Sequence, residues 1–262
     1  MKLGLLVFGQ FRSYKTWFPY NLQQLRNQFP DAEIDIFILS NRLNTGNYSK
    51  EAEEEIKHMC YQFNIHIRLF TFWEDHQHLH AYDQNLYEYN TKIFMKGIKP
   101  SYNNDWMMNM WFRTYCLWKM TTECVDITKY KYFMFIRAFD ARHKFLKPIL
   151  PLLLQPSSNE TIFCCFDMIF IGSPSMIDTL YKFGNNIKHW KEIDWTNEFI
   201  STFYSFDTVL ASVKQTYCSE SQSLKYIIDN IPNWINIRFD HNTSYSSTPT
   251  DAYIDSRIDR QV

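Results

Sequence analysis

LGLLVFGQFR, residues 3–12, is a short apolar run that ends at a glycine and is followed by polar side chains. Such a run predicts a buried β-strand. EIDIFILS at residues 33–40 predicts a second strand, and residues 65–72 predict a third. Apolar residues at helical spacing separate these runs, with helices expected from about Pro19 and after the capping residue Ser49. This β-α-β-α-β order predicts a parallel sheet covered by helices, which is an α/β fold.

The rest of the sequence adds further elements to this sheet. A long helix is expected at 105–125, where Met, Trp and Thr recur every three or four residues, and this stripe should be core. The remaining elements expected are strands at 131–139, 161–171 and 234–239 and helices from Pro174 and from about Asp207. We expect a single Rossmann-like domain over residues 1–241, followed by a polar tail at 242–262.

Charge and glycine content exclude several function classes. The chain has 27 Lys and Arg against 28 Asp and Glu, a formal net charge of -1. Proteins that bind nucleic acids by neutralising phosphates need a basic face, so this balance argues against that class. The six glycines form no GxGxxG and none precedes Lys-Ser or Lys-Thr, which excludes a dinucleotide fingerprint and a P-loop. GxSxG and HExxH are absent as well.

Cysteine usage and hydropathy point to a cytoplasmic protein. The six cysteines form no CxxC pair, and we expect reduced thiols. No uninterrupted apolar stretch approaches the length of a membrane span, so none is expected. The first apolar run lacks a cleavage site and is interpreted as a strand rather than a signal peptide.

Polar side chains follow the predicted strands where each one ends. In an open α/β sheet, ligands bind at the carboxyl ends of the strands. An acid and an imidazole with neighbouring arginines suit a divalent metal and a diphosphate. The residues at these positions are Gly9, Gln10, Arg12, Ser40, Asn41, Arg137, Asp140, Arg142, Asp240 and His241.

Several of these runs, taken in order, resemble a known family. They are VFGQFRSY (7–14), IDIFIL (34–39), the helix with Trp106, Met110 and Arg113, YKYFMFIRAFDAR (130–142) and FDMIFIGSPSMIDTL (166–180). This sequence is similar to small GT-A glycosyltransferases of bacterial capsule clusters and of giant algal viruses, including chloroviruses. The resemblance covers about residues 3–185. It implies a GT-A-like fold, with residues 1–140 as the nucleotide-sugar half and 141–241 as the acceptor half.

The resemblance implies a site for a nucleotide sugar. Its donor-binding residues would be Gly9, Gln10, Arg12, Asp35, Ser40, Arg113, Arg137, Asp140 and Arg142. Asp35 lies inside its strand, where it could contact the base or ribose or could be structural.

Metal dependence is left open by the sequence. Phe139-Asp140 stands at the DXD-like position, where Mn²⁺ or Mg²⁺ would neutralise the leaving diphosphate. Ala138 replaces the first acid of that motif, so Asp140 is the only carboxylate that the motif provides as a metal ligand. Asp240 or His241 could supply further ligands, and the neighbouring arginines could partly replace the ion.

An inverting reaction needs a carboxylate to deprotonate the acceptor hydroxyl. Asp207, expected at a helix start, is similar to the acid that many inverting GT-A enzymes use, and we favour it. Asp167, in CCFDMIFIGS within the strand expected at 161–171, is the alternative. Asp207 could also be only a helix cap.

The resulting functional prediction is a glycosyltransferase. It would move one sugar from a nucleotide-diphosphate donor, a UDP-sugar and in particular UDP-xylose, to a hydroxyl of a glycan or glycoprotein in viral or surface glycan synthesis. If the chain is virus-encoded, the location expected is the host cytoplasm. A retaining transferase of the same fold and a non-catalytic carbohydrate-binding protein remain open. A zinc site at His76, His78 and His80 is a further alternative.

Overall fold

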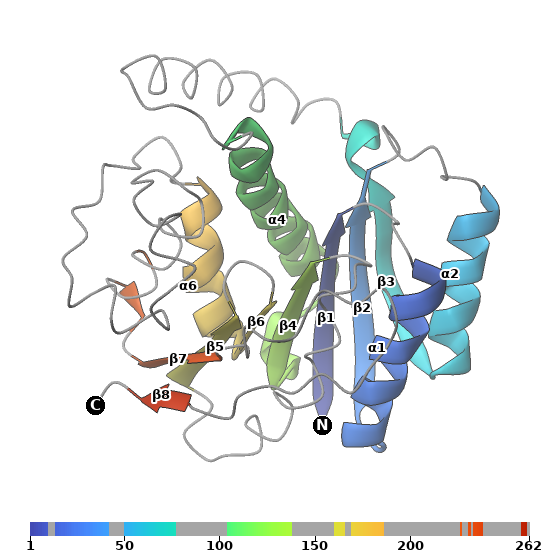
Figure 1. Cartoon of the computed structure of the whole chain (residues 1–262), viewed down its shortest axis with the longest axis horizontal. Helices are drawn as coiled ribbons and strands as arrows, with labels where there is room; N and C mark the ends of the chain where they lie inside the picture. Colours follow the sequence, from blue (N-terminus) through green and yellow to red (C-terminus); the bar gives the residue numbers. More distant parts are fainter. Residues whose placement is uncertain are drawn as a thin grey trace, which may run out of the picture.

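The structure, a computed structural model, describes residues 1–9, 14–41, 50–76, 104–137, 160–165, 169–185, 226, 230–231, 233–237 and 258–260. These residues form one eight-stranded sheet with helices on both faces (Figure 1). The strands are β1 (Lys2–Gly9), β2 (Glu33–Ser40), β3 (Ile65–Phe72), β4 (Tyr132–Arg137), β5 (Thr161–Cys165), β6 (Ile169–Gly172), β7 (Asn233–Ile237) and β8 (Ile258–Arg260). The helices are α1 (Tyr14–Gln28), α2 (Lys50–Gln62), α4 (Asn104–Cys124) and α6 (Pro174–Asn185), with 3-10 turns η1 (Trp73–Asp75) and η2 (Ile127–Lys129).

The strand order is β3-β2-β1-β4-β6-β5-β7-β8. β1 pairs in parallel with β2 and β4, and β2 pairs in parallel with β3, which reproduces the 3-2-1-4 order of doubly wound nucleotide-binding folds. β6 runs antiparallel to β4 and β5, and β8 runs antiparallel to β7. The prediction of a single-domain α/β fold with a mostly parallel, helix-flanked sheet is confirmed.

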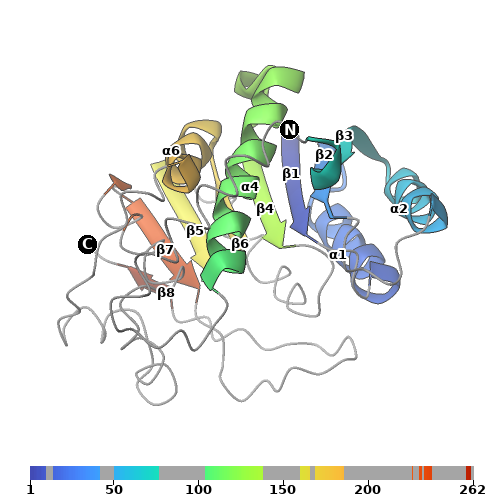
Figure 2. The ribbon, with the colours of Figure 1, turned by 90° about the horizontal axis from the view of Figure 1, so that it is seen from above.

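The two faces of the sheet have different cores. On the face covered by α1 and α2, the strands contribute mainly aliphatic side chains such as Leu5, Val7 and Ile36. The other face packs against α4 and α6, on the opposite side of the sheet (Figure 2). Its buried side chains are largely aromatic and include Phe8, Phe37, Trp111, Trp118, Phe133, Phe135, Phe170 and Tyr181. Successive strand residues point to opposite faces, so alternation within each strand separates the two cores.

The longest described helix, α4, has 21 residues and packs along the aromatic face. Trp111, Thr114, Trp118 and Thr121 are buried, so the expectation that this stripe is core is confirmed where the side chains are described. Arg113 lies off the stripe and is half-buried. Within the described part of the chain, no helix has both the length and the apolar character needed to cross a membrane.

α1 begins about one turn earlier than predicted. It starts at Tyr14, so Pro19 lies inside the helix rather than at its first position. Tyr14 and Phe18 are both buried in the aliphatic core. Packing of these rings outweighs the backbone hydrogen bond that proline cannot donate.

The predicted strand at 161–171 is wrong, because the structure has two strands there. β5 ends at Cys165, β6 begins at Ile169, and the two pair antiparallel. An apolar run indicates burial but does not indicate where the chain reverses direction. Similarly, β8 pairs with β7 from within residues 242–262, which were expected to be a tail. The helix expected from Asp207 lies outside the described residues.

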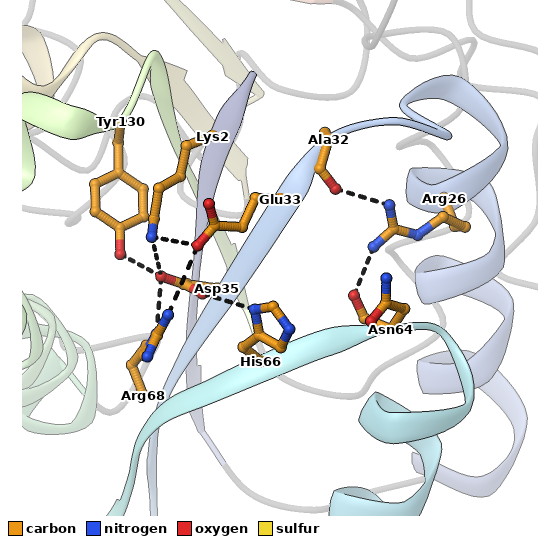
Figure 3. A network of polar contacts seen from close by, with 9 residues as sticks. All are labelled: Lys2, Arg26, Ala32, Glu33, Asp35, Asn64, His66, Arg68 and Tyr130. Atoms are coloured by element: carbon orange, nitrogen blue, oxygen red, sulfur yellow. Dashed lines mark hydrogen bonds and ion pairs between the residues drawn. The ribbon is translucent and has the colours of Figure 1, made fainter.

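Arg26 joins the carboxyl ends of α1 and α2 (Figure 3). Its guanidinium donates hydrogen bonds to five backbone carbonyls, those of Phe29, Pro30, Ala32, Phe63 and Asn64. Carbonyls at helix carboxyl ends lack intrahelical donors, and the negative end of the helix dipole favours a cation there. One side chain therefore completes the hydrogen bonding where both helices end.

Gly4 allows the Phe133 ring to lie close to β1. A Cβ atom at Gly4 would lie 2.1 Å from Cε1 of Phe133, and Phe133 is fully buried. We expect Gly4→Ala to lower the free energy of unfolding by about 1–3 kcal/mol, because the ring must move within a close-packed core. Urea unfolding at pH 7 measures the loss.

Gly172→Ala is the matched control. A Cβ atom there would lie 3.2 Å from Cγ1 of Ile162 and from Cβ of Met176, which small shifts can relieve. Its loss should be smaller than that of Gly4→Ala. An equal or larger loss at Gly172 would contradict the assigned role of the Phe133 ring.

Candidate functional site

The ends of β1 and β2 meet at the carboxyl edge of the sheet. Gly9 and Ser40 are register partners, and the Ser40 hydroxyl donates a hydrogen bond to the Gly9 carbonyl at 2.8 Å. Ser40 is fully buried. Gly9 has a φ of 125°, a conformation that side-chain-bearing residues rarely adopt. The Ser40 side chain thus holds the two strand ends together, and Gly9 provides the backbone geometry.

Arg113 of α4 reaches the same edge. Its Nη1 lies 3.4 Å from Oδ1 of Asn41, the residue that directly follows β2. Its Cζ lies 4.6 Å from the ring centroid of Trp73, the first residue after β3. Helix α4 and the ends of two strands therefore meet around one guanidinium.

Both of these Arg113 partners are buried and neutral. Asn41 is 8% exposed and Trp73 is 4% exposed. The Trp73 and Phe112 rings make a T-shaped contact, with ring centroids 6.1 Å apart. An amide oxygen and an aromatic face orient a guanidinium without adding a negative charge to it. Such a group can bind phosphate or carboxylate through paired N–H donors.

Arg137 is the last residue of β4 and is the register partner of Phe8 in β1. Its backbone therefore lies beside the end of β1, at the point where the strand order reverses between β1 and β4. Crevices at such switch points are the usual ligand sites of open α/β sheets. The sheet thus brings Gly9, Ser40, Arg113 and Arg137, all predicted donor-binding residues, to one edge.

The other predicted site residues cannot be placed in this way. They lie outside the described residues and are Gln10, Arg12, Asp140, Arg142, Asp167, Asp207, Asp240 and His241. Of the three histidines considered for zinc, only His76 is described, and its Nε2 lies 2.9 Å from the Thr71 hydroxyl.

Asp35 lies away from the carboxyl edge. It is five residues before Ser40 on β2, a separation of about 17 Å at the usual rise of a strand. Four groups contact its fully buried carboxylate (Figure 3): Nζ of Lys2 at 3.0 Å, Nε of Arg68 at 3.0 Å, Nδ1 of His66 at 3.5 Å and the Tyr130 hydroxyl. These contacts favour the structural alternative for Asp35, and we leave it out of the donor site.

A β-bulge in β3 aims Arg68 at this carboxylate. The pairing of β3 with β2 skips Arg68, which is the extra residue between the paired residues Ile67 and Leu69. Bulges commonly redirect a side chain in this way. The sequence shows only a polar residue within a strand and contains no signal for the skipped pairing.

The Asp35 network controls the charge of its own members. Burial alone would raise the pKa of Asp35, because it disfavours the carboxylate form. Hydrogen bonds from Tyr130, Lys2 and Arg68 outweigh burial and lower this pKa below its ordinary value. Burial and the Asp35 carboxylate together raise the pKa of Tyr130, so its hydroxyl stays a donor.

Glu33, Asp35 and His66 form a cluster of potential metal ligands, with ligand atoms within 4.8 Å of one another. Lys2 and Arg68 already pair with both carboxylates, so a metal cation would meet two positive charges. This cluster does not fit the divalent ion predicted from the sequence, which would be needed at the opposite edge, and we assign it no metal.

Sequence reasoning missed the contacts of Asn41 and Trp73 with Arg113. Each of the two residues directly follows a predicted strand, and this position at a strand end was the one sequence feature that could have marked them as site residues. Which helix residue meets them depends on how α4 packs across the sheet, and local spacing does not contain that information.

Asp35→Asn should lower the free energy of unfolding at pH 7 by about 2–4 kcal/mol, because it leaves Lys2 and Arg68 without their shared buried anion. A lowered folded-state pKa means that the Asp35 contribution is present above about pH 4 and is lost as pH falls through the folded pKa. The stability difference between wild type and variant should therefore shrink between pH 5 and pH 2, as measured by urea unfolding.

Asp31→Asn serves as the control, since Asp31 is an exposed acid just before β2. It should change stability by less than about 0.5 kcal/mol. A difference between wild type and Asp35→Asn that stays constant down to pH 2 would rule out the ionised network as its source.

The chain matches no family model and no curated protein. Among solved structures, it is similar to the crystal structure of the galactosyltransferase LgtC in complex with donor and acceptor sugar analogues. The two share 10% sequence identity and a TM-score of 0.42, over 98% of this chain and 86% of the other. A likeness this distant carries no argument about function. The resemblance to transferases of viruses and capsule clusters therefore stays a prediction, and a functional assignment depends on the site.

Proposed function

We propose that this protein is a glycosyltransferase that binds a nucleotide-diphosphate sugar at the carboxyl edge of its sheet. The observation that carries the proposal is the guanidinium of Arg113, held by Asn41 and Trp73. Its partner Asn41 follows β2, which is the neighbour of β1 in the sheet, and the switch point lies between β1 and β4. A diphosphate is the anion that best matches a fixed guanidinium at this place in an α/β sheet.

The chemistry follows from the charge that forms when the sugar leaves. Cleavage of the bond between the sugar and the diphosphate concentrates negative charge on the phosphate oxygens. A preorganised cation stabilises this charge without having to reorganise during the reaction. In our proposal, Arg113 binds the diphosphate and Arg137 lies beside the phosphates. Gly9 and Ser40 form the part of the sheet edge against which the nucleoside packs.

The finer assignments of the proposal come from the sequence. The donor is a UDP-sugar, with UDP-xylose as the particular candidate, and the acceptor is a hydroxyl of a glycan or glycoprotein. Asp207, or alternatively Asp167, takes the acceptor proton in an inverting reaction. Asp140, with Asp240 or His241, holds Mn²⁺ or Mg²⁺, which would supply further neutralisation of the diphosphate.

Thermal unfolding with a panel of nucleoside diphosphates and nucleotide sugars, with and without Mn²⁺, tests the donor class. UDP ligands at 100 times Kd should stabilise the protein by about 2.7 kcal/mol. A Mn²⁺-dependent shift would support the metal assignment. If no nucleotide binds and glycans do, the protein is the carbohydrate-binding alternative and the proposal is wrong. The anomeric configuration of the product separates an inverting from a retaining reaction.

Arg113→Gln should weaken UDP binding by about tenfold to hundredfold, because it removes charged hydrogen bonds to the diphosphate. Titration calorimetry at constant ionic strength measures the change. Lys119→Gln is the charge-matched control, because Lys119 is an exposed cation on the same helix. It should leave the affinity unchanged. Equal effects of the two variants would mean that Arg113 contributes only general positive charge and does not bind the diphosphate directly.

A further inference from the structure

We infer that Asn41 and Trp73 are positioning residues that fix the guanidinium of Arg113 in the orientation in which it binds a diphosphate. This inference rests on the proposed function and adds two residues to that site. Neither residue needs to contact the donor itself. They order the long, flexible side chain of Arg113 before the ligand binds.

The three residues come from separate elements that the fold brings together. Asn41 follows β2, Trp73 follows β3, and Arg113 lies in the middle of α4. The guanidinium has the indole face on one side, at 4.6 Å, and the amide oxygen of Asn41 at 3.4 Å. Two contacts in different directions restrict both the position and the tilt of the planar group.

The Trp73 indole is itself held in place. Its ring makes a T-shaped contact with Phe112, the neighbour of Arg113 on α4. The η1 turn is closed by a hydrogen bond from the His76 backbone N–H to the Trp73 carbonyl at 3.0 Å. The His76 ring in turn lies 2.9 Å from the Thr71 hydroxyl of β3. The aromatic platform is thus fixed through both its side chain and its backbone.

The chemistry of the two contacts suits a ligand-binding cation. At the other end of the sheet, Arg68 is bound by the carboxylates of Asp35 and Glu33, which cancel its charge. Asn41 and Trp73 are neutral, so these two contacts orient Arg113 without placing a negative charge beside it. Ordering the side chain during folding removes a conformational cost that binding would otherwise carry.

Substitutions at two positions, Trp73 and Asn41, separate the orientation of the guanidinium from its charge. Trp73→Leu removes the aromatic face and should make the guanidinium mobile, whereas Trp73→Phe retains a weaker face and should have a smaller effect. Asn41→Asp places a carboxylate beside the guanidinium, so Arg113 should stay ordered while its charge is cancelled. A purely structural role of Asn41 and Trp73 would not produce these opposite responses.

The first readout needs no ligand. NMR relaxation of the Arg113 side-chain Nε–H should report an ordered group in wild type and in Asn41→Asp, and a mobile group in Trp73→Leu. Trp118→Leu is the matched control, because Trp118 is a buried indole on the same helix that packs against Phe133. It should lower the melting temperature and leave Arg113 ordered. An Arg113 side chain equally ordered in wild type and in Trp73→Leu would overturn the inference.

The second readout is the affinity for UDP and for inorganic pyrophosphate by calorimetry. Trp73→Leu and Asn41→Asp should each weaken both ligands by about tenfold, while Trp118→Leu should not. If wild type binds UDP and the Trp73 and Asn41 variants bind it equally well, the positioning role is wrong and the proposed function stands. If wild type binds neither ligand, the proposed function fails, and the positioning role fails with it.

Discussion

The buried carboxylate of Asp35 is the constraint on which the arrangement of the sheet depends. A charge without water must be compensated by partners in good geometry, or the fold loses several kcal/mol. Its hydrogen-bonding partners are Lys2 of β1, Arg68 of β3 and Tyr130, which lies between η2 and β4. Strands β1, β2 and β3 and the segment before β4 must therefore meet in one arrangement. A slip of β1 would remove Lys2 from the carboxylate, and a slip of β3 would remove Arg68.

The described contacts at the two ends of the sheet differ in charge. At the amino end, the cations Lys2 and Arg68 are paired with the carboxylates of Glu33 and Asp35. At the carboxyl end, Arg113 is held by an amide oxygen and an aromatic face, neither of which is anionic. Parallel strands place all their carboxyl ends at one edge, so polar residues following different strands converge there. This geometry is the physical basis for placing the proposed donor site at that edge.

The two cores support these ends in different ways. Aliphatic side chains under α1 and α2 pack a compact layer, and Arg26 completes the carbonyls where both helices end. Aromatic side chains under α4 and α6 fill the other layer, and they continue to the carboxyl edge through Phe112 and Trp73. Most of the aromatic side chains that the structure describes are therefore core, and Tyr61 is an exposed exception. One aromatic residue of this layer also contacts a candidate ligand-binding cation.

Local pattern determined much of this fold. Apolar runs of strand length ending at Gly9 and Ser40, the helical stripe of α4 and the Ser173-Pro174 helix start all involve neighbours in the chain, and each was predictable from spacing. The carboxyl edge as the site region followed from the same pattern through the rule for parallel sheets.

Tertiary structure determined the contacts between distant segments, which the spacing of residues along the chain does not indicate. The sequence left Asp35 open between a ligand contact and a structural role. The partners that favour the structural role, Lys2, Arg68 and Tyr130, lie 33 or more residues away in the sequence. The reversal between β5 and β6, the bulge at Arg68 and the meeting of Trp73 with Arg113 likewise depend on contacts between distant segments. The periodicity of apolar residues indicates which face of a helix or strand a side chain occupies. Only the packing of the whole chain determines which residue from another element contacts that side chain.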